Sequence, residues 1–264
     1  MDGDAGATIA RGNTAEIRVL DDGRVCKLYD DPDAVESARY EARATRIANE
    51  AGLPVPAVDG LVTVDERPGV VLERVDGPSL LDDLEGRPWT LASGARTLAD
   101  LHARIHGRRA PDLPLLTDRL RERIERAPSV SAAVHGRALA VLESLPDDDR
   151  LLHGDFHPAN VLLGDRGPVV IDWLDASAGP PAADVARTVL LLRFADGGPL
   201  VRTLGRAFER LYLRIYRRER PLDTSLVRRW ELPVAVARLT EDVSGTRLRR
   251  FVERGVERGR WSGT

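Results

Sequence analysis

The sequence lacks the features that mark secreted and membrane proteins. It contains one cysteine, Cys26, so no internal disulfide can form, and a reducing compartment suits this composition. No apolar run approaches the roughly 20 residues that span a bilayer. The first ten residues carry aspartates instead of a basic region, so they show no signal-peptide pattern. These absences predict a cytoplasmic protein without membrane association.

Lysine is almost absent as well. The chain has 39 lysine and arginine residues, and Lys27 is its single lysine. Arginine presents a broad planar fork, whereas lysine presents a compact charge on a thin flexible stem, so one cannot always replace the other. A coding bias toward arginine explains the other basic positions. It leaves two explanations for Lys27, which are chance survival and a functional need for an ammonium group.

The charges are unevenly distributed. The formal net charge is −3, yet residues 201–264 contain 16 arginines against 8 acidic residues. A basic segment can bind nucleic acid or another anionic partner. Here Leu204, Phe208, Leu211 and Ile215 recur at helical spacing among the arginines, which predicts an amphipathic helix with a solvated charged face. We therefore expect no nucleic-acid partner.

The pattern of the 264 residues changes near residue 78. Before it, β-rich runs are separated by turn signals, as in antiparallel strands. These runs are ATIAR, AEIRVL, RVCKLY, LVTV and GVVLERV. One helix over residues 31–52 interrupts them, and helical patterns prevail after residue 78. The sequence predicts an α+β fold, with a β-rich domain over residues 1–77 and a mainly helical domain over residues 78–264.

One segment of the helical half reads as a β-hairpin. NVLL and PVVIDW are apolar, and the turn signal GDRG separates them. The start of the first strand of a hairpin lies beside the end of the second, so Asn160 and Asp172 should meet at its open end. Asp155 lies five residues upstream, in the loop that leads there. Carboxylate and amide oxygens suit Mg²⁺ together with phosphate. Alternatively, the three residues are loop caps and a strand end.

The motif HGDFHPAN followed by IDW resembles the signature of aminoglycoside phosphotransferases and choline kinases. These small-molecule kinases are similar to protein kinases in fold, with His-Gly-Asp where protein kinases have His-Arg-Asp. The resemblance extends from about residue 8 to residue 192. It implies a bilobal protein-kinase-like fold, with a small antiparallel-sheet lobe that contains one helix and a larger helical catalytic lobe.

The resemblance also implies a role for individual residues. Asp155 is then the catalytic aspartate that accepts the proton of the substrate hydroxyl, and Asn160 and Asp172 are the ligands of Mg²⁺. Lys27 contacts the phosphates of ATP, and Glu41 is its ion-pair partner. On this basis the lone lysine is functional.

Two further nucleotide contacts are implied by position. The first hairpin turn, RGNTAE, lacks the glycines of protein kinases, so Asn13 and Thr14 are the residues expected near the phosphates, although a plain turn explains them equally well. The connector LERVDG corresponds to the hinge whose backbone binds adenine, around Glu73 to Val75.

The other polar residues of the motif region have structural interpretations. Too few histidines and cysteines occur at suitable spacing for a zinc site. We interpret His153 as an orienting residue of the catalytic loop, His157 as a packing residue of that loop, and His102 as a structural residue of a helix. Asp184 matches a recurrent family aspartate and should support the catalytic loop.

The implied function is transfer of the γ-phosphate of ATP, with Mg²⁺, to a hydroxyl group of a small molecule by a monomer or weak dimer. Aminoglycosides and other antibiotics are the first acceptor class that the family suggests, although the basic C-terminal segment argues against a highly cationic substrate. The alternatives are a kinase of an amino alcohol or sugar, and an inactive pseudokinase that binds nucleotide.

Overall fold

The computed structural model describes residues 6–20, 23–127, 130–195, 197–241 and 246–261. The chain forms two compact units. The first contains Met1–Thr90 together with Pro158–Ala176, and the second contains Leu91–His157 together with Ser177–Thr264. The predicted division into functional domains at residues 77 and 78 stays a prediction.

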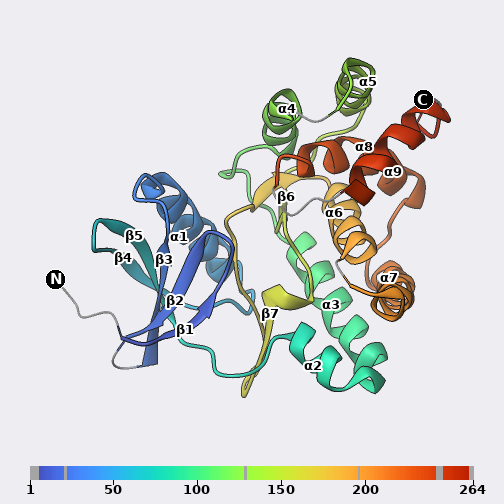
Figure 1. Cartoon of the computed structure of the whole chain (residues 1–264). Helices are drawn as coiled ribbons and strands as arrows, with labels where there is room; N and C mark the ends of the chain where they lie inside the picture. The colour runs from blue at the N-terminus through green and yellow to red at the C-terminus, as the bar shows by residue number, and fades with distance from the viewer. Residues whose placement is uncertain (1–5, 21–22, 128–129, 196, 242–245, 262–264) are drawn as a thin grey trace. The chain divides into compact units, whose positions relative to one another are not determined.

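The first unit is built on a five-stranded antiparallel sheet (Figure 1). Its strand order is β1-β2-β3-β5-β4, so β3 lies in the middle. The strands are β1 (Thr8–Arg11), β2 (Ala15–Val19), β3 (Arg24–Tyr29), β4 (Val58–Val64) and β5 (Arg67–Glu73). β1, β2 and β3 fall within the β-rich runs that the sequence indicates, whereas β4 begins three residues before the run LVTV and β5 two residues before the run GVVLERV.

Helix α1 (Val35–Glu50) packs against this sheet through small side chains. Ala38 and Ala42 of the helix form a buried cluster with Ala15, Tyr29 and Val70 of the sheet. Because alanine side chains are small, the helix backbone lies close to the strands, and the side chain of Glu41 reaches Lys27 on β3. The predicted helix is confirmed, and its neighbour Gly52 has φ 73°, a left-handed conformation that suits a helix end.

The predicted hairpin is also confirmed. Strands β7 (Val161–Gly164) and β8 (Gly167–Val170) pair antiparallel, and Val161 lies opposite Val170. The backbone N–H of Leu163 donates to the carbonyl of Pro78 at 2.9 Å. The hairpin is thus tied to the connector that precedes helix α2 (Leu80–Gly86), and this explains why it belongs to the first unit.

The second unit is mainly helical. Strands β6 (Arg150–Leu152) and β9 (Ser177–Gly179) form a small antiparallel pair. Its longer helices are α3 (Leu91–His106), α4 (Leu116–Arg126), α5 (Ala132–Glu143), α6 (Pro181–Phe194), α7 (Pro199–Glu219), α8 (Thr224–Arg238) and α9 (Thr246–Glu257). Helix α6 is buried from its second to its tenth residue and contacts both α7 and α8, so it forms the centre of this unit.

Helix α7 is amphipathic, as the sequence predicts, but of the four apolar residues that define the pattern Phe208 is buried and the other three are half-buried. Phe208, Tyr212 and Tyr216 are buried, whereas Arg210 and Arg214 are exposed on the opposite side of the helix. Within the described residues, no helix is both long and apolar enough to cross a membrane.

A substitution at Gly77 tests how closely the connector packs against the β7–β8 hairpin. The φ of Gly77 is 146°, and a Cβ atom there would lie 2.2 Å from the carbonyl oxygen of Leu163. We predict that Gly77→Ala lowers the free energy of unfolding by about 2–4 kcal/mol, because it adds backbone strain and a steric clash. Urea denaturation measures this change. Gly86→Ala is the control, since nothing lies within 4 Å of its Cβ; a similar loss in both variants would contradict the account.

Candidate functional site

The single lysine lies in a buried ion-pair cluster of the first unit. Its Nζ contacts Glu41 Oε1 at 2.8 Å and Asp172 Oδ1 at 2.9 Å, and Lys27 is only 9% exposed. Burial by itself would lower the pKa of Lys27, but the two carboxylates outweigh it and raise the pKa above the usual value. Lys27 therefore stays charged at any physiological pH.

Glu41 has a second donor that the sequence interpretation missed. The hydroxyl of Tyr29 donates to Glu41 Oε2, while Lys27 occupies Oε1. Burial, followed by the nearby charge of Glu41, raises the pKa of Tyr29, so its hydroxyl remains a donor. Residues two apart on a strand face the same side, so Tyr29 could have been inferred from Lys27 by strand periodicity.

Asp172 follows β8 in an unusual backbone conformation. Its φ is 65°, a left-handed value that aspartate adopts more readily than most residues but still at some energetic cost. The backbone N–H of Ile171 donates to the carbonyl of Asn160 at 3.0 Å, so Asn160 lies next to the end of the same hairpin. The predicted convergence of Asn160 and Asp172 thus agrees with the backbone pairing.

The chemistry of these two residues fits a magnesium ion. Both offer hard oxygen donors, which Mg²⁺ prefers, and the side chain of Asp172 is 42% exposed and so accessible to an ion with its water or phosphate ligands. Asn160 is buried, with 8% exposure, which fixes its position.

The first hairpin turn presents the two residues expected near phosphate. Asn13 and Thr14 are both exposed at the tip between β1 and β2. The turn is closed by the N–H of Gly12, which donates to the carbonyl of Ala15 at 2.8 Å. The carbonyl of Thr14 accepts the N–H of Asp30 at 2.9 Å, which ties the tip to the end of β3.

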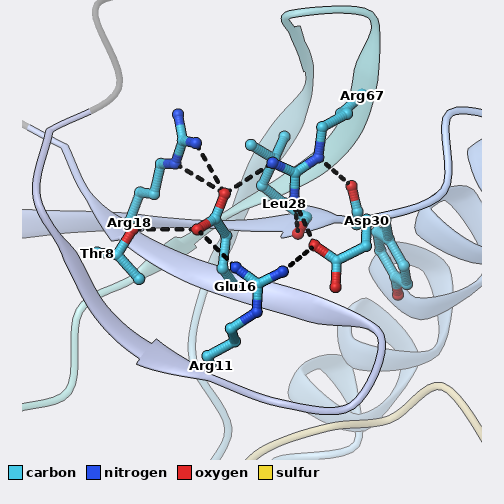
Figure 2. A network of polar contacts seen from close by, with 8 residues as sticks. Thr8, Arg11, Glu16, Arg18, Leu28, Asp30 and Arg67 are labelled. Carbon is cyan, nitrogen blue, oxygen red and sulfur yellow. Dashed lines mark hydrogen bonds and ion pairs between the residues drawn. The ribbon is translucent and has the colours of Figure 1, made fainter.

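A network of ion pairs fixes both arms of this hairpin, as Figure 2 shows. Arg67 contacts Glu16 at 2.7 Å and Asp30 at 2.7 Å, and Arg11 contacts the same two carboxylates. The hydrogen bond from Arg67 is the main cause that lowers the pKa of Glu16 to about 2, and Thr8 and Arg18 contribute to it. Both strands that carry the exposed tip are thereby held to β3 and β5.

The predicted hinge residues lie where β5 ends. The carboxylate of Glu73 is engaged by Arg166 and by the backbone N–H of Ala57. Within the described part of the chain, the backbone groups of Val75 make no hydrogen bond to protein. Such backbone groups are what an adenine ring requires, so the structure is compatible with the expected role of Val75.

The predicted catalytic aspartate belongs to the second unit. Asp155 Oδ1 accepts from Arg187 at 2.9 Å, and Asp155 Oδ2 lies 3.4 Å from His157 Nε2. Burial would raise the pKa of Asp155, but His157 and Arg187 lower it below the usual range. Asp155 is therefore ionised at neutral pH. The interpretation of His157 as a packing residue was wrong, because its ring contacts this carboxylate.

A second buried aspartate supports the loop that carries Asp155. Asp184, from α6, accepts the backbone N–H of His153 at 2.7 Å and that of Gly154 at 3.1 Å. Within the loop, the N–H of Asp155 donates to His153 Nδ1 at 3.2 Å. The expected supporting role of Asp184 and the orienting role of His153 agree with this geometry.

Two histidines complete the surroundings of Asp184. The Nε2 atoms of His102 and His106 lie 3.1 and 3.2 Å from Asp184 Oδ2, and their Nδ1 atoms lie 2.6 and 2.7 Å from the hydroxyls of Tyr212 and Tyr216. A carboxylate only accepts, so each Nε2 carries a proton and each Nδ1 accepts from tyrosine. This satisfies every ring nitrogen without a metal ion, although the three potential ligands lie within 4.8 Å of one another.

His102 is structural, as expected, but the sequence analysis did not predict that the two histidines pair with two tyrosines. The signal for it is the spacing: the histidines are four apart on α3 and the tyrosines four apart on α7, so each pair lies on one helix face.

Comparison with known proteins places this chain among phosphotransferases. A sequence model of the phosphotransferase enzyme family matches residues 7–222, which is most of the chain. The chain belongs to this family. A comparison with curated proteins finds no match.

Several solved structures share the fold. Aminoglycoside phosphotransferase APH(4)-Ia, as a thermostable mutant with AMP-PNP and hygromycin B, is 18% identical with a TM-score of 0.69, over 98% of this chain and 94% of that one. A type VIII aminoglycoside-3'-phosphotransferase is 20% identical with a TM-score of 0.64, over 86% and 90% of the two chains. APH(2")-IIa with streptomycin and ATP is 16% identical with a TM-score of 0.63, over 96% and 90%.

These likenesses confirm the predicted fold class, a small antiparallel-sheet part with a larger helical part of the protein-kinase-like kind. Family membership makes the protein a small-molecule kinase of this family. The roles of the individual residues stay predictions.

The buried histidine cluster should make stability depend on pH. Burial, helped by His102, lowers the pKa of His106 to about 3, so it is neutral in the folded protein but protonates in the unfolded chain below about pH 6.5. The unfolded state then binds more protons, so the free energy of unfolding should fall as pH decreases from about 6.5, by up to about 1.4 kcal/mol per pH unit.

We predict that His106→Gln flattens this slope, because glutamine does not titrate. Urea denaturation between pH 4.5 and 7.5 measures it, with His135→Gln as the control that removes a histidine outside the cluster. Equal slopes in wild type and His106→Gln would contradict the assignment.

Proposed function

We propose that this protein transfers the γ-phosphate of ATP to a hydroxyl group of a small molecule. The observation that carries the proposal is the buried Lys27, whose ammonium contacts both Glu41 and Asp172. Kinase sites require a lysine for the phosphates, a carboxylate that orients it and an acidic metal ligand close by. Family membership supports the same reaction class.

On the nucleotide side, each residue has a defined task. Lys27 contacts the α- and β-phosphates, and Glu41 keeps its ammonium in place. The backbone and side chains of Asn13 and Thr14 cover the phosphates, and the backbone from Glu73 to Val75 binds adenine. The ion pairs of Arg67 with Glu16 and Asp30 support the proposal, because they hold the strands on either side of the turn and leave Asn13 and Thr14 exposed.

Asn160 and Asp172 would hold the magnesium ion, which neutralises charge on the phosphates when it is bound. The contact of Lys27 with Asp172 supports this assignment, since it brings the phosphate-binding cation to the metal-binding carboxylate. Two of the solved structures to which this chain is similar contain AMP-PNP or ATP, which is in line with a nucleotide substrate.

On the acceptor side, Asp155 orients the hydroxyl group and accepts its proton. An ionised carboxylate of low pKa suffices, because in a loose transition state the hydroxyl loses its proton late. Asp184 positions the loop through two backbone N–H groups, and it does not act on the substrate.

An active enzyme is favoured over a pseudokinase, because Lys27, Asp155, Asn160 and Asp172 are all present. Aminoglycosides are the first acceptors to test, since hygromycin B and streptomycin are present in two similar structures. Other antibiotics, amino alcohols and sugars come next. We further propose a cytoplasmic monomer or weak dimer that binds no nucleic acid.

The proposal is tested by Asp155→Asn. We predict that this variant lowers kcat by about 100- to 10,000-fold, because the proton acceptor is lost, while ATP still binds. Magnesium-dependent ADP release is measured against a panel of antibiotics, amino alcohols, sugars and hydroxy acids, and ATP binding by calorimetry. Asp165→Asn, an exposed turn residue, is the matched control. Wild-type turnover in Asp155→Asn would show that Asp155 is not the base.

A further inference from the structure

An arginine contacts the predicted catalytic aspartate and connects it to a cluster of charged side chains. Arg187, from α6, contacts Asp155 at 2.9 Å through one terminal nitrogen and Glu241 at 2.6 Å through the other. Its side chain is 9% exposed, so this pair of contacts is largely shielded from water. Arg187 therefore links Asp155 to Glu241, which lies just after α8.

Two more arginines converge on the same glutamate. Arg238, at the end of α8, has its Nε 3.5 Å from Glu241, and Arg123, from α4, has a terminal nitrogen 3.8 Å from it. The carboxylate of Glu241 thus contacts guanidinium groups from three different helices. All of these residues belong to the second unit.

The cations lie close enough to repel each other. Burial, followed by the charge of Arg187, lowers the pKa of Arg238. Among the described residues, this cluster sets three guanidinium groups against two carboxylates, Asp155 and Glu241, and buried charges are costly unless they are balanced. A bound anion would balance the remaining positive charge, and the side chain of Arg123 is 31% exposed, so a ligand can reach the cluster at Arg123.

This cluster is separate from the general excess of arginine in the C-terminal segment. Arg210 and Arg214 of α7 are exposed on the side opposite Tyr212, which faces His102 and the core. Net charge alone could not distinguish these solvated arginines from those near Asp155. The structure makes that distinction.

We infer that the acceptor is an alcohol that carries a carboxylate or phosphate group, which Arg123 and Arg238 bind while its hydroxyl lies at Asp155. This inference rests on the proposed function and names the substrate class. Guanidinium groups suit both anions, because their planar fork binds two oxygens at once. A polycationic aminoglycoside is the opposite of what this cluster attracts.

The reaction balances without another reactant. The hydroxyl oxygen of the acceptor bonds to the γ-phosphorus of ATP, and the bond from that phosphorus to the bridging oxygen breaks. ADP leaves with the electron pair, and the hydroxyl proton passes to Asp155. The anionic group of the acceptor takes no part in the bond changes and serves only to place the hydroxyl.

Matched acceptors test the inference. D-gluconate and glucose 6-phosphate are compared with glucose, D-glycerate is compared with glycerol, and kanamycin represents the polycations. ADP release with ATP and Mg²⁺ gives kcat/KM for each. We expect a preference of at least about tenfold for the anionic member of a pair, since a charge-assisted contact to arginine is typically worth that much.

Three variants identify the residues. Arg123→Gln should reduce the preference for the anion about tenfold, and Arg238→Gln repeats the test at a second position. Arg206→Gln removes an exposed arginine of α7 and is the control that keeps the preference. Calorimetry with gluconate and with inorganic sulfate measures anion affinity without turnover, and it should fall in both test variants.

The outcomes separate this inference from the proposed function. Kanamycin turnover above that of every anion supports phosphotransfer and overturns the inference. Anion binding that Arg123→Gln weakens, without ADP release from any acceptor, supports the anion site and counts against phosphotransfer. Absence of anion binding, or equal affinity in wild type and Arg123→Gln, overturns the inference.

Discussion

The candidate nucleotide site depends on keeping one ammonium group charged while it is buried. Burial disfavours a charged lysine, and Lys27 remains charged only because Glu41 and Asp172 both lie within 2.9 Å of it. Three elements of the first unit bring these charged groups together. The alanines of α1 bring Glu41 to the sheet, β3 places Lys27 in the middle of it, and the β7–β8 hairpin brings Asp172 to the same ammonium.

A second buried carboxylate organises the loop that carries Asp155. Asp184 accepts two backbone N–H groups of the loop that carries Asp155 and two histidine N–H groups. Four donors around one carboxylate keep it ionised and fix the loop backbone. Behind the histidines, Tyr212 and Tyr216 set the ring orientation. The loop is therefore held by side chains of α3, α6 and α7.

Much of this could be predicted from the sequence where the information is local. β-rich runs between turn signals located β1 to β3 and the later parts of β4 and β5, and the GDRG turn located the β7–β8 hairpin. The family resemblance implied the pairing of Lys27 with Glu41. Several of the missed contacts join residues far apart in the chain. Arg187 is 32 residues from Asp155 and 54 from Glu241, and no local pattern links them.

The positions of the charged side chains in space could not be predicted from the sequence either. The sequence shows that the C-terminal segment is basic, but only the packing of α4, α6 and α8 shows which arginines gather around Glu241. Membership of the hairpin in the first unit was equally hidden, because it depends on backbone hydrogen bonds such as that from Leu163 to Pro78.

The central claim is that Lys27 binds nucleotide phosphate, and calorimetry of ATP and adenosine with wild type and Lys27→Met tests it most directly. The account predicts that wild type binds ATP with Mg²⁺ at least about tenfold more tightly than adenosine, and that Lys27→Met loses most of this difference while its affinity for adenosine stays the same. Equal affinity of both proteins for ATP would contradict it.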